Sequence, residues 1–329
     1  MRLLPSRLSF LTRPDEDLLA AARRQGIAIR WGCRNGVCEI CQARLCQGEV
    51  LNLRTRERQQ AGDFILLCRA EAHSDLAVQI EDVMAAGEIR PQLVHCSIES
   101  IESLNHDVYR VRLKTPPGQP VAFHAGQYLA IERPGTDPAW FSIASAPEGP
   151  QSRHLELHIQ AAEEWNTALE IMEFLRREKR VPVRLPFGKA CLAAVPEEPL
   201  VLVAAGTGFA QMKSLVDYLH AYHAEIPVFL YWGVRKHEDM YLRSLPDRWA
   251  EDWPNFHFRP QVADNEDNDW EGHHEQLARA VLAGGHDFTQ ARVIASGSPV
   301  MVYTLMDHLV EHGLDVGRFM SDVLEYAPR

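Results

Sequence analysis

The chain has 329 residues, of which 46% are hydrophobic and 24% are charged, a composition typical of a globular protein with two or three domains. Its formal net charge of -11 argues against binding to nucleic acid or to an anionic membrane surface. No apolar run approaches the roughly 18 residues that cross a bilayer. Three arginines interrupt the first apolar positions, so the sequence lacks a continuous signal-peptide core and we expect a cytoplasmic protein: Arg2, Arg7 and Arg13.

The charge is unevenly distributed along the chain. Residues 1–88 hold twelve arginines, no lysine and twelve acidic residues, so this segment is neutral and the rest carries the whole net charge of -11. The arginine-rich segment is open to two interpretations: a surface that meets an acidic partner, or a solvated face without a partner. Within it, residues 15–27 predict a helix that Asp15 or Asp17 caps and Gly26 ends, and residues 83–92 predict a linker.

Four cysteines have the spacing of a metal site. Cys33, Cys38 and Cys41 follow a C-x4-C-x2-C pattern, and Cys68 comes after 26 intervening residues. A disulfide framework is improbable in a cytoplasmic protein of this size, and zinc sites usually show two short cysteine pairs. The spacing instead predicts a plant-type 2Fe-2S cluster, for which three thiolates converge from one tight loop and the fourth arrives from another segment.

Glycines in the cysteine loop support this interpretation. Gly32 and Gly36 allow the backbone to turn and to direct N–H groups at the sulfur atoms. Glu39 is unusual, because ferredoxins of this type usually carry glycine directly after the second cysteine. We interpret the remaining three cysteines as small apolar residues: Cys46, Cys96 and Cys191.

The middle of the chain has the alternating pattern of antiparallel strands. A six-stranded antiparallel barrel is expected over about 93–190, interrupted by one helix at 167–177 with an apolar face. Five of the strands are visible as alternating runs: 94–101, 108–115, 127–134, 154–160 and 181–186.

From about residue 198 the pattern changes to buried strands that alternate with helices. The apolar runs 199–206, 227–233 and 291–297 predict parallel strands, and 210–223 predicts an amphipathic helix. Between the first strand and that helix lies Gly206-Thr207-Gly208, which is either a plain turn or a site where a diphosphate approaches the backbone at a helix N-terminus.

With the segments FSIASAPEG, AAGTGFA, LYWGVR and SGSPVM, residues 15–325 resemble the ferredoxin–NADP reductase superfamily. The likeness is stronger to reductases with an N-terminal plant-type ferredoxin domain, such as bacterial oxygenase reductase components and the CDP-6-deoxy-glucoseen reductase type. The resemblance implies a multidomain α+β and α/β protein. Its parts would be a β-grasp 2Fe-2S ferredoxin domain (1–88), an antiparallel β-barrel FAD domain (92–193) and a Rossmann-like NAD(P)-binding domain (197–329).

The resemblance also assigns flavin-binding residues. Trp140, Phe141 and Ser142 occupy the flavin motif, and Thr167 stands at the helix N-terminus that faces the flavin pyrophosphate, although it or Asn166 could simply cap the helix. Two features depart from the family. Ala139 replaces an arginine that binds the FAD pyrophosphate in the family, and the carboxylates of Glu163 and Glu164 replace a glycine-rich turn. Tyr326 is either the C-terminal aromatic residue that covers the flavin or a residue of the tail.

On the nicotinamide side the resemblance implies a site formed by two loops. Ser296 takes the place of a cysteine beside the nicotinamide and is the expected catalytic residue, with neighbours that would bind the cofactor: Gly206, Thr207, Gly208 and Gly297. NADPH requires Arg or Lys at the ribose. Arg235 and Lys236 are present, but the acidic pair Glu238 and Asp239 follows, so NADH is favoured over NADPH. The pair His273-His274 is interpreted as an exposed loop feature rather than a metal site.

Three functions remain open at this stage. The first is a reductase that passes electrons from NADH through FAD and the cluster to an oxygenase or dehydratase component. The second is a flavin-poor one-electron relay, redox sensor or structural homologue that keeps only the cluster. The third is a reductase that donates electrons to free flavin.

Overall fold

The computed structural model describes residues 1–329 except 82, 85–86, 150–151, 163–165 and 264–269. The chain divides into two compact units, Met1–Ile89 and Arg90–Arg329, which are described separately. No helix among the described residues is both long enough and apolar enough to cross a membrane.

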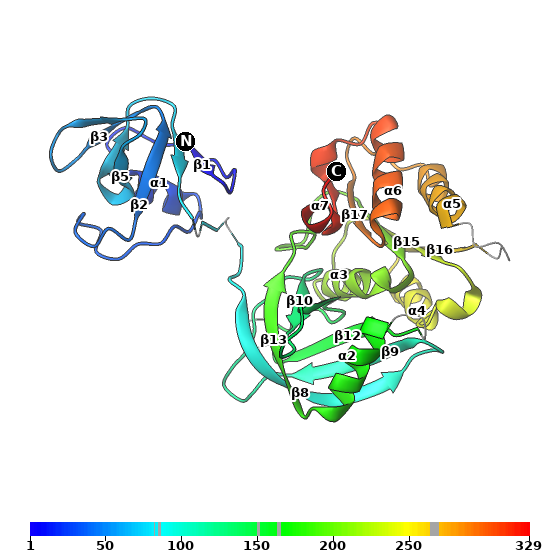
Figure 1. Ribbon diagram of the computed structural model, residues 1–329. Coiled ribbons are helices and arrows are strands. Elements are labelled where there is room, and N and C mark those ends of the chain that lie inside the picture. Colours follow the sequence, from blue (N-terminus) through cyan, green and yellow to red (C-terminus); the bar gives the residue numbers. More distant parts are fainter. Residues whose placement is uncertain (82, 85–86, 150–151, 163–165, 264–269) are drawn as a thin grey trace. The chain divides into compact units, whose positions relative to one another are not determined.

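The first unit consists of two small β-sheets with the α-helix α1 and a short 3-10 helix (Figure 1). Its four-stranded sheet has the order β1-β7-β2-β5, in which β1 and β7 are parallel and the other pairs antiparallel. A smaller sheet has the order β4-β3-β6. The elements are β1 (Arg2–Leu4), α1 (Leu18–Arg24), β2 (Gln42–Gln47), β3 (Glu49–Asn52), β4 (Arg58–Gln60), β5 (Phe64–Leu66), η1 (Leu67–Arg69), β6 (Ala70–Ala72) and β7 (Ala77–Gln79).

Helix α1 forms where the sequence predicts a helix. Of the two candidate caps, Asp17 is the one used, because its carboxylate accepts a 2.8 Å hydrogen bond from the backbone N–H of Ala20. Gly26 ends the turn with φ 75°. The apolar face of α1 is completely buried in the core of this unit: Leu18, Leu19, Ala21 and Ala22.

The second unit begins with the predicted six-stranded antiparallel barrel, in the order β11-β10-β13-β8-β9-β12. Its open edge is bridged after β11, where the N–H of Ala144 donates a 2.7 Å hydrogen bond to the carbonyl of Glu156. Helix α2 begins at Asn166 and buries Ile171, Met172 and Leu175 in the barrel core. The elements are β8 (Gln92–Ser103), β9 (Val108–Lys114), β10 (Tyr128–Ile131), β11 (Ala139–Ser142), β12 (His154–Gln160), α2 (Asn166–Arg177) and β13 (Arg180–Phe187).

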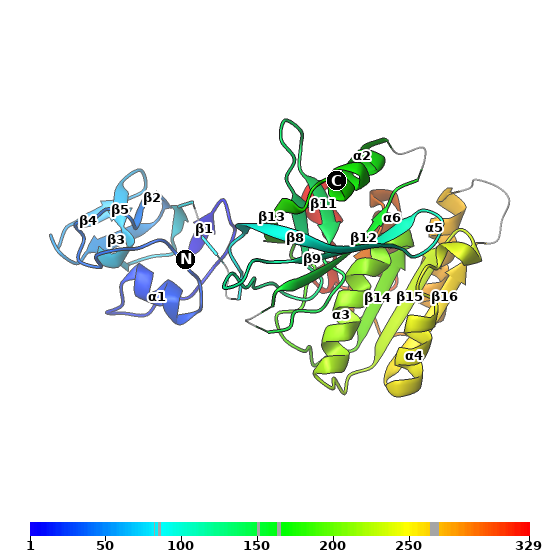
Figure 2. The same ribbon diagram turned by 90° about the horizontal axis from the view of Figure 1, so that it is seen from below.

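A five-stranded parallel sheet follows, in the order β16-β15-β14-β17-β18, and it has helices on both faces (Figures 1 and 2). Its strands are β14 (Leu200–Ala205), β15 (Val228–Val234), β16 (Phe256–Val262), β17 (Arg292–Ser296) and β18 (Phe319–Met320). Its helices are η2 (Gly206–Gly208), α3 (Phe209–Ala221), η3 (His237–Asp239), α4 (Ser244–Asp252), α5 (Trp270–Ala283), α6 (Pro299–Glu311), η4 (Val316–Arg318) and α7 (Val323–Tyr326).

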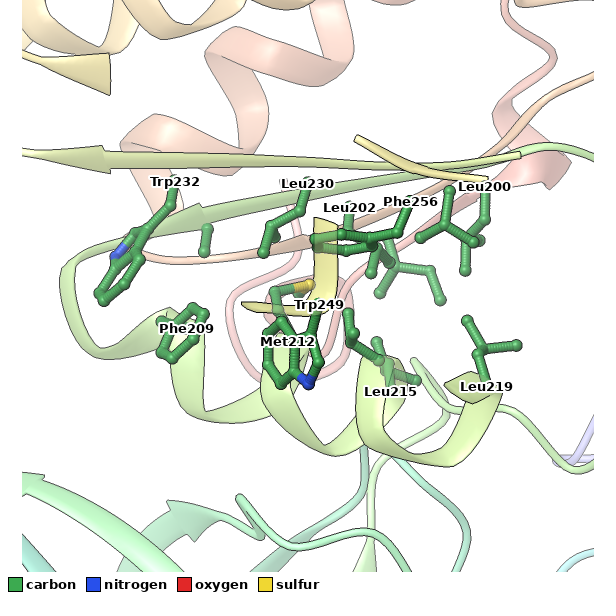
Figure 3. Packing of buried hydrophobic residues seen from close by; sticks show 14 of the residues in the cluster. Leu200, Leu202, Phe209, Met212, Leu215, Leu219, Leu230, Trp232, Trp249 and Phe256 are labelled. Carbon is green, nitrogen blue, oxygen red and sulfur yellow. The ribbon is translucent and has the colours of Figure 1, made fainter. Parts of the chain in front are cut away.

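Strand β14 is apolar throughout because both of its faces are covered. Leu200 and Leu202 point toward α3 and α4, where Figure 3 shows them with Met212 and Trp249. Alternate residues of the same strand pack on the other side of the sheet, against α5 and α6. The aromatic residues of β15 belong to the cores on the two faces of this sheet, with Trp232 0% exposed. The predicted fold class, with a β-grasp unit, a barrel and a parallel sheet, is therefore confirmed.

The barrel and the parallel sheet share a buried polar junction. Gln211, on α3, is 1% exposed. Its Nε2 lies 2.8 Å from the carbonyl oxygen of Gly126, 3.0 Å from that of Ala190 and 3.0 Å from Oδ2 of Asp322. Because these acceptors come from the barrel and from the segment after β18, one side chain connects three remote parts of the unit.

Candidate functional site

The first unit brings the four predicted cysteines together as two pairs. The thiol of Cys33 accepts hydrogen bonds from the backbone N–H groups of Val37 and Cys38, at 3.4 and 3.3 Å, and the thiol of Cys38 accepts one from Cys33, at 3.3 Å. The second pair is Cys41 and Cys68, whose thiols are in hydrogen-bond contact. Cys33 is exposed, whereas both members of the second pair are buried.

The two pairs differ in their electrostatic surroundings. Backbone N–H groups of the loop, that of Asn35 foremost, lower the pKa of Cys33 to about 6. Burial raises the pKa of Cys68 to about 11, and the neighbouring Cys41 thiol adds to this effect. A cysteine binds a metal ion through its deprotonated form, the thiolate. Cys33 is therefore ready to bind a cation, whereas Cys68 becomes a thiolate only when a nearby positive charge compensates for its burial.

The cysteine loop needs a left-handed backbone at several positions. Gly36 has φ 80°, and a Cβ atom there would lie 2.9 Å from Cγ of Arg69. Glu39, which stands where glycine is usual, adopts φ 58° and therefore occupies the left-handed region despite its side chain. The loop thus keeps the shape that a glycine would give, at some cost in stability.

The residues present fit a 2Fe-2S cluster. Four free thiols form two pairs, which is the arrangement that two irons require, and loop N–H groups point at sulfur. Arg69, directly after Cys68, has a buried Nε with no hydrogen-bond partner among the described residues, so a negatively charged group would also satisfy it. A structural zinc site would require one tetrahedral set of four sulfurs rather than two pairs.

In the second unit, the predicted flavin residues meet the predicted nicotinamide residues. A cavity of about 510 Å³ lies between β10, β11, the end of β17 and the C-terminal segment. Six predicted residues line it: Trp140, Phe141, Ser142, Ser296, Gly297 and Tyr326. Residues that were not predicted complete the lining, from β10, α3, β17 and the C-terminal segment: Tyr128, Gln211, Ala295, Ser321, Asp322 and Val323.

A smaller neighbouring cavity of about 270 Å³ continues this site toward the nucleotide loop. It shares residues of β11 and of the loop after β17 with the first cavity, and it adds Thr207, Gly208 and His158. The two loops are in direct contact, since a Cβ on Gly208 would lie 2.3 Å from the carbonyl oxygen of Ser296. Thr207 and Gly208 therefore lie within reach of the predicted catalytic serine.

Aromatic rings form one wall of the larger cavity. Tyr128 and Phe187 are stacked with centroids 5.9 Å apart, and Trp140 meets both rings edge-on at 5.7 and 5.0 Å. Trp140 remains 52% exposed, which leaves surface for a planar ligand. The side chain of Ala139, in contrast, is buried in the barrel core and does not line the cavity.

Asp322 is a site residue that the sequence pattern did not reveal. It lines the larger cavity, and its Oδ1 accepts a 3.2 Å hydrogen bond from the backbone N–H of Ala190. Burial raises the pKa of Asp322 to about 6, with a further contribution from the charge of Glu325. Asp322 follows a two-residue strand, so no strong periodic signal marked its position.

His158 is a second unpredicted residue, on the wall of the smaller cavity. Its Nδ1 lies 3.1 Å from the hydroxyl of Tyr241, and its Nε2 lies 2.9 Å from Oε1 of Glu156. Burial lowers the pKa of His158. Burial also acts to raise the pKa of Glu156, but the hydrogen bond from His158 and the charge of Lys213 outweigh it and hold that pKa at about 2. Both ring nitrogens are thus engaged, and the ring has a fixed orientation.

A third cavity, of about 290 Å³, lies beyond the ends of β14, β15 and β16. Gly206 and Thr207 line it, as does Asp239 of the predicted acidic pair. Asp239 is held in place by the backbone N–H of Lys236, 3.0 Å from its Oδ2, and lies 4.0 Å from Nε of Arg235. The expectation of an exposed loop is wrong for His273 and His274, which lie half-buried near the start of α5 and line this cavity as well.

Two predicted features do not join these cavities. Thr167 is exposed in the first turn of α2 and is not among the residues that line the three cavities. Glu163 and Glu164 lie outside the described residues. Glu238, the partner of Asp239 in the acidic pair, is exposed and does not line the third cavity.

Comparison with known proteins gives matches over both units. Residues 1–73 match the 2Fe-2S iron-sulfur cluster binding domain family, and residues 202–306 match the oxidoreductase NAD-binding domain family. The chain is 30% identical over 325 residues to the CDP-6-deoxy-L-threo-D-glycero-4-hexulose-3-dehydrase reductase of Yersinia pestis, covering 98% of this chain and 97% of the relative.

Two further relatives differ in their named roles. Reductase component 2 of the terephthalate 1,2-dioxygenase of a Comamonas species is 28% identical and covers 98% of this chain and 96% of the relative. The NAD(P)H-flavin reductase of Vibrio harveyi is 36% identical over 195 residues, covering 57% of this chain and 79% of the relative. Among solved structures, an Amycolatopsis cytochrome P450 reductase has a similar fold, with a TM-score of 0.65, 22% identity and 97% of each chain covered.

Proposed function

Because the chain belongs to the ferredoxin-fused reductases of the ferredoxin–NADP reductase superfamily, we propose that it carries electrons from NADH through FAD to a 2Fe-2S cluster. The electrons then pass to an oxygenase or dehydratase component in the cytoplasm. The three functional parts in this proposal are the ferredoxin domain (1–88), the FAD domain (92–193) and the NAD(P)-binding domain (197–329).

The observation that carries this proposal is the pair of adjoining cavities between β11 and the loop after β17. They share Trp140, Phe141, Ser142, Ser296 and Gly297, so a ligand held by the barrel and a ligand held by the parallel sheet would meet there. A bound flavin would supply the conversion from the two electrons of a hydride to single electrons.

The residues of the chain have distinct roles in this site. Phe141 offers an apolar face to a planar ring, while the hydroxyls of Ser142 and Ser296 provide hydrogen-bond groups on the two sides of the cavity. Ser296 is proposed as the catalytic residue because it lies where the ring systems would meet. Tyr326, 63% exposed, is proposed as the aromatic residue that covers the open side of the larger cavity.

In the first unit, the cluster would be held by four ligands that share one compact unit of the fold: Cys33, Cys38, Cys41 and Cys68.

The third cavity supports NADH as the donor. Asp239 lines it at the position where the ribose of a nicotinamide cofactor binds in this fold class. A 2′-phosphate would meet this carboxylate at close range, and the repulsion would oppose NADPH binding even with Arg235 nearby. We expect the Asp239→Asn variant to lose at least part of the preference for NADH.

The test of the proposed function is an absorption spectrum of the purified full-length protein together with extraction of its flavin. We expect iron, acid-labile sulfide and flavin in the same preparation, and faster ferricyanide reduction with NADH than with NADPH. A protein that stays colourless after anaerobic cluster reconstitution contradicts the proposal. A cluster without any flavin binding would instead indicate a one-electron relay or redox sensor.

One observation favours a second function, the reduction of exchangeable flavin. Among the described residues that line the 510 Å³ cavity there is no Lys or Arg, and the only charged side chain is Asp322. A flavin there would be held by its ring and not by its phosphates. The similarity to a flavin reductase over 195 residues is consistent with this. Riboflavin, FMN and FAD would then bind with similar affinities, and NADH oxidation would rise with added flavin, whereas tight and exclusive FAD binding contradicts this function.

A further inference from the structure

Beyond the four cysteines, the first unit contains one arginine next to them, Arg69, whose Nε lacks a hydrogen-bond partner in the part of the chain that the structure describes. Arg69 ends η1, directly after Cys68. Its Nε is buried. A buried guanidinium nitrogen without a partner is costly, and an anion beside it would offset that cost.

The side chain of Arg69 packs against the cysteine loop at Gly36. A Cβ atom on Gly36 would lie 2.9 Å from Cγ and 3.7 Å from Nε of Arg69. The backbone N–H of Gly36 in turn donates a hydrogen bond to the thiol of Cys68. Arg69 thus stays next to both segments that would provide cluster ligands: the loop from Cys33 to Cys41, and Cys68 itself.

We infer that Arg69 is the counter-charge of the cluster and sets its reduction potential. This inference rests on the proposed cluster assignment. With four thiolate ligands, a 2Fe-2S cluster is dianionic when oxidised and trianionic when reduced, and reduction adds one electron without a change in its bonds. A fixed positive charge stabilises the trianion more than the dianion. Arg69 therefore makes the cluster easier to reduce, and it acts through charge rather than by touching the acceptor.

The position of Arg69 offers a matched experiment on the full-length protein. Arg69→Met keeps an unbranched apolar stem against Gly36 and removes the charge, whereas Arg69→Lys keeps the charge. Arg7→Met is the control, because it changes the net charge by the same amount at an exposed residue in the turn after β1. Strand β1 lies at one edge of the sheet and β5, which leads to Cys68, lies at the other edge. The measurement is the midpoint potential of the cluster, from a redox titration followed by electron paramagnetic resonance.

An opposite charge at close range shifts such an equilibrium by about tenfold or more. We therefore expect Arg69→Met to lower the ratio of reduced to oxidised cluster about tenfold at a fixed potential, which corresponds to a midpoint lower by about 59 mV for a one-electron couple. Arg69→Lys should retain most of the wild-type potential, and Arg7→Met should change it little.

An unchanged potential in Arg69→Met, or an equal shift in Arg7→Met, overturns the inference. If Arg69→Met does not retain iron, the midpoint potential of Arg69→Gln is measured instead. A lower potential is expected there too, and an unchanged potential overturns the inference. A wild-type protein that binds no cluster would disprove the proposed function itself. A wild-type cluster whose potential does not respond to residue 69 disproves only the role of Arg69.

Discussion

Asp322 allows a quantitative test of the site through the pH dependence of stability. Burial raises its pKa to about 6, from an ordinary value of 3.8. Well below the ordinary pKa of 3.8 the carboxyl is protonated in both the folded and the unfolded protein. Between about pH 4 and pH 6 the unfolded protein ionises this carboxyl while the folded protein keeps it protonated, and above that range both states are ionised. The free energy of unfolding therefore falls over this range, by about 3 kcal/mol at most.

The Asp322→Asn variant removes this titration. The Asn side chain can still accept the hydrogen bond from Ala190, and any change at Gln211 adds an offset that does not depend on pH. We expect the stability of the variant relative to wild type to increase from about pH 3 to about pH 7, most steeply near pH 5, and to stay level at higher pH. The assay is urea unfolding of both proteins at several pH values, followed by tryptophan fluorescence.

The control for this experiment is Asp252→Asn, an exposed carboxyl at the end of α4. Its effect on stability should be small and nearly independent of pH. A constant difference between wild type and Asp322→Asn across the whole range, or a slope equal to that of the control, would refute the reasoning. In that case, Asp322 would ionise inside the cavity without a cost in stability, and its burial would not raise its pKa.

Three further predictions concern the loops of the two units. Cys68→Ser should abolish the visible absorption of the cluster, whereas Cys46→Ser, at an exposed cysteine, should leave it intact; loss in both variants would contradict the ligand assignment. Glu39→Gly should stabilise the first unit by about 1 kcal/mol by relieving a left-handed backbone, and a lower thermal midpoint would contradict this. Gly208→Ala should place a methyl group 2.3 Å from the carbonyl of Ser296 and raise the KM for NADH at least tenfold in steady-state assays, and an unchanged KM would show that the loops separate freely.

Elements with strong periodicity could be predicted from the sequence. The helix that Asp17 caps, the buried strand before Gly206 and the alternating strands of the barrel each follow a local rule. Strand β11 was not predicted, because it is short, lies at an edge and follows a turn with Pro138. Strand β16 was not predicted either, because it contains Pro260 and is only half-buried.

The candidate site was predictable where spacing along the chain carries the information. The cysteine pattern and the glycine turn are local, so the sequence identified them. Asp322 and His158 become site residues only when α3, β12 and the C-terminal segment meet, which no local pattern records. Thr167 is the opposite case. Its position at a helix N-terminus could be predicted from the sequence, but its side chain is exposed and does not line the described cavities.

The buried amide of Gln211 has a consequence for how ligands enter and leave. Separating the barrel from the parallel sheet would break the three contacts of that amide and replace them with hydrogen bonds to water, at a net cost of about 0.5–1.5 kcal/mol for each bond. Ligand exchange should therefore leave this seam closed and proceed from the solvent side, past the exposed ring of Tyr326.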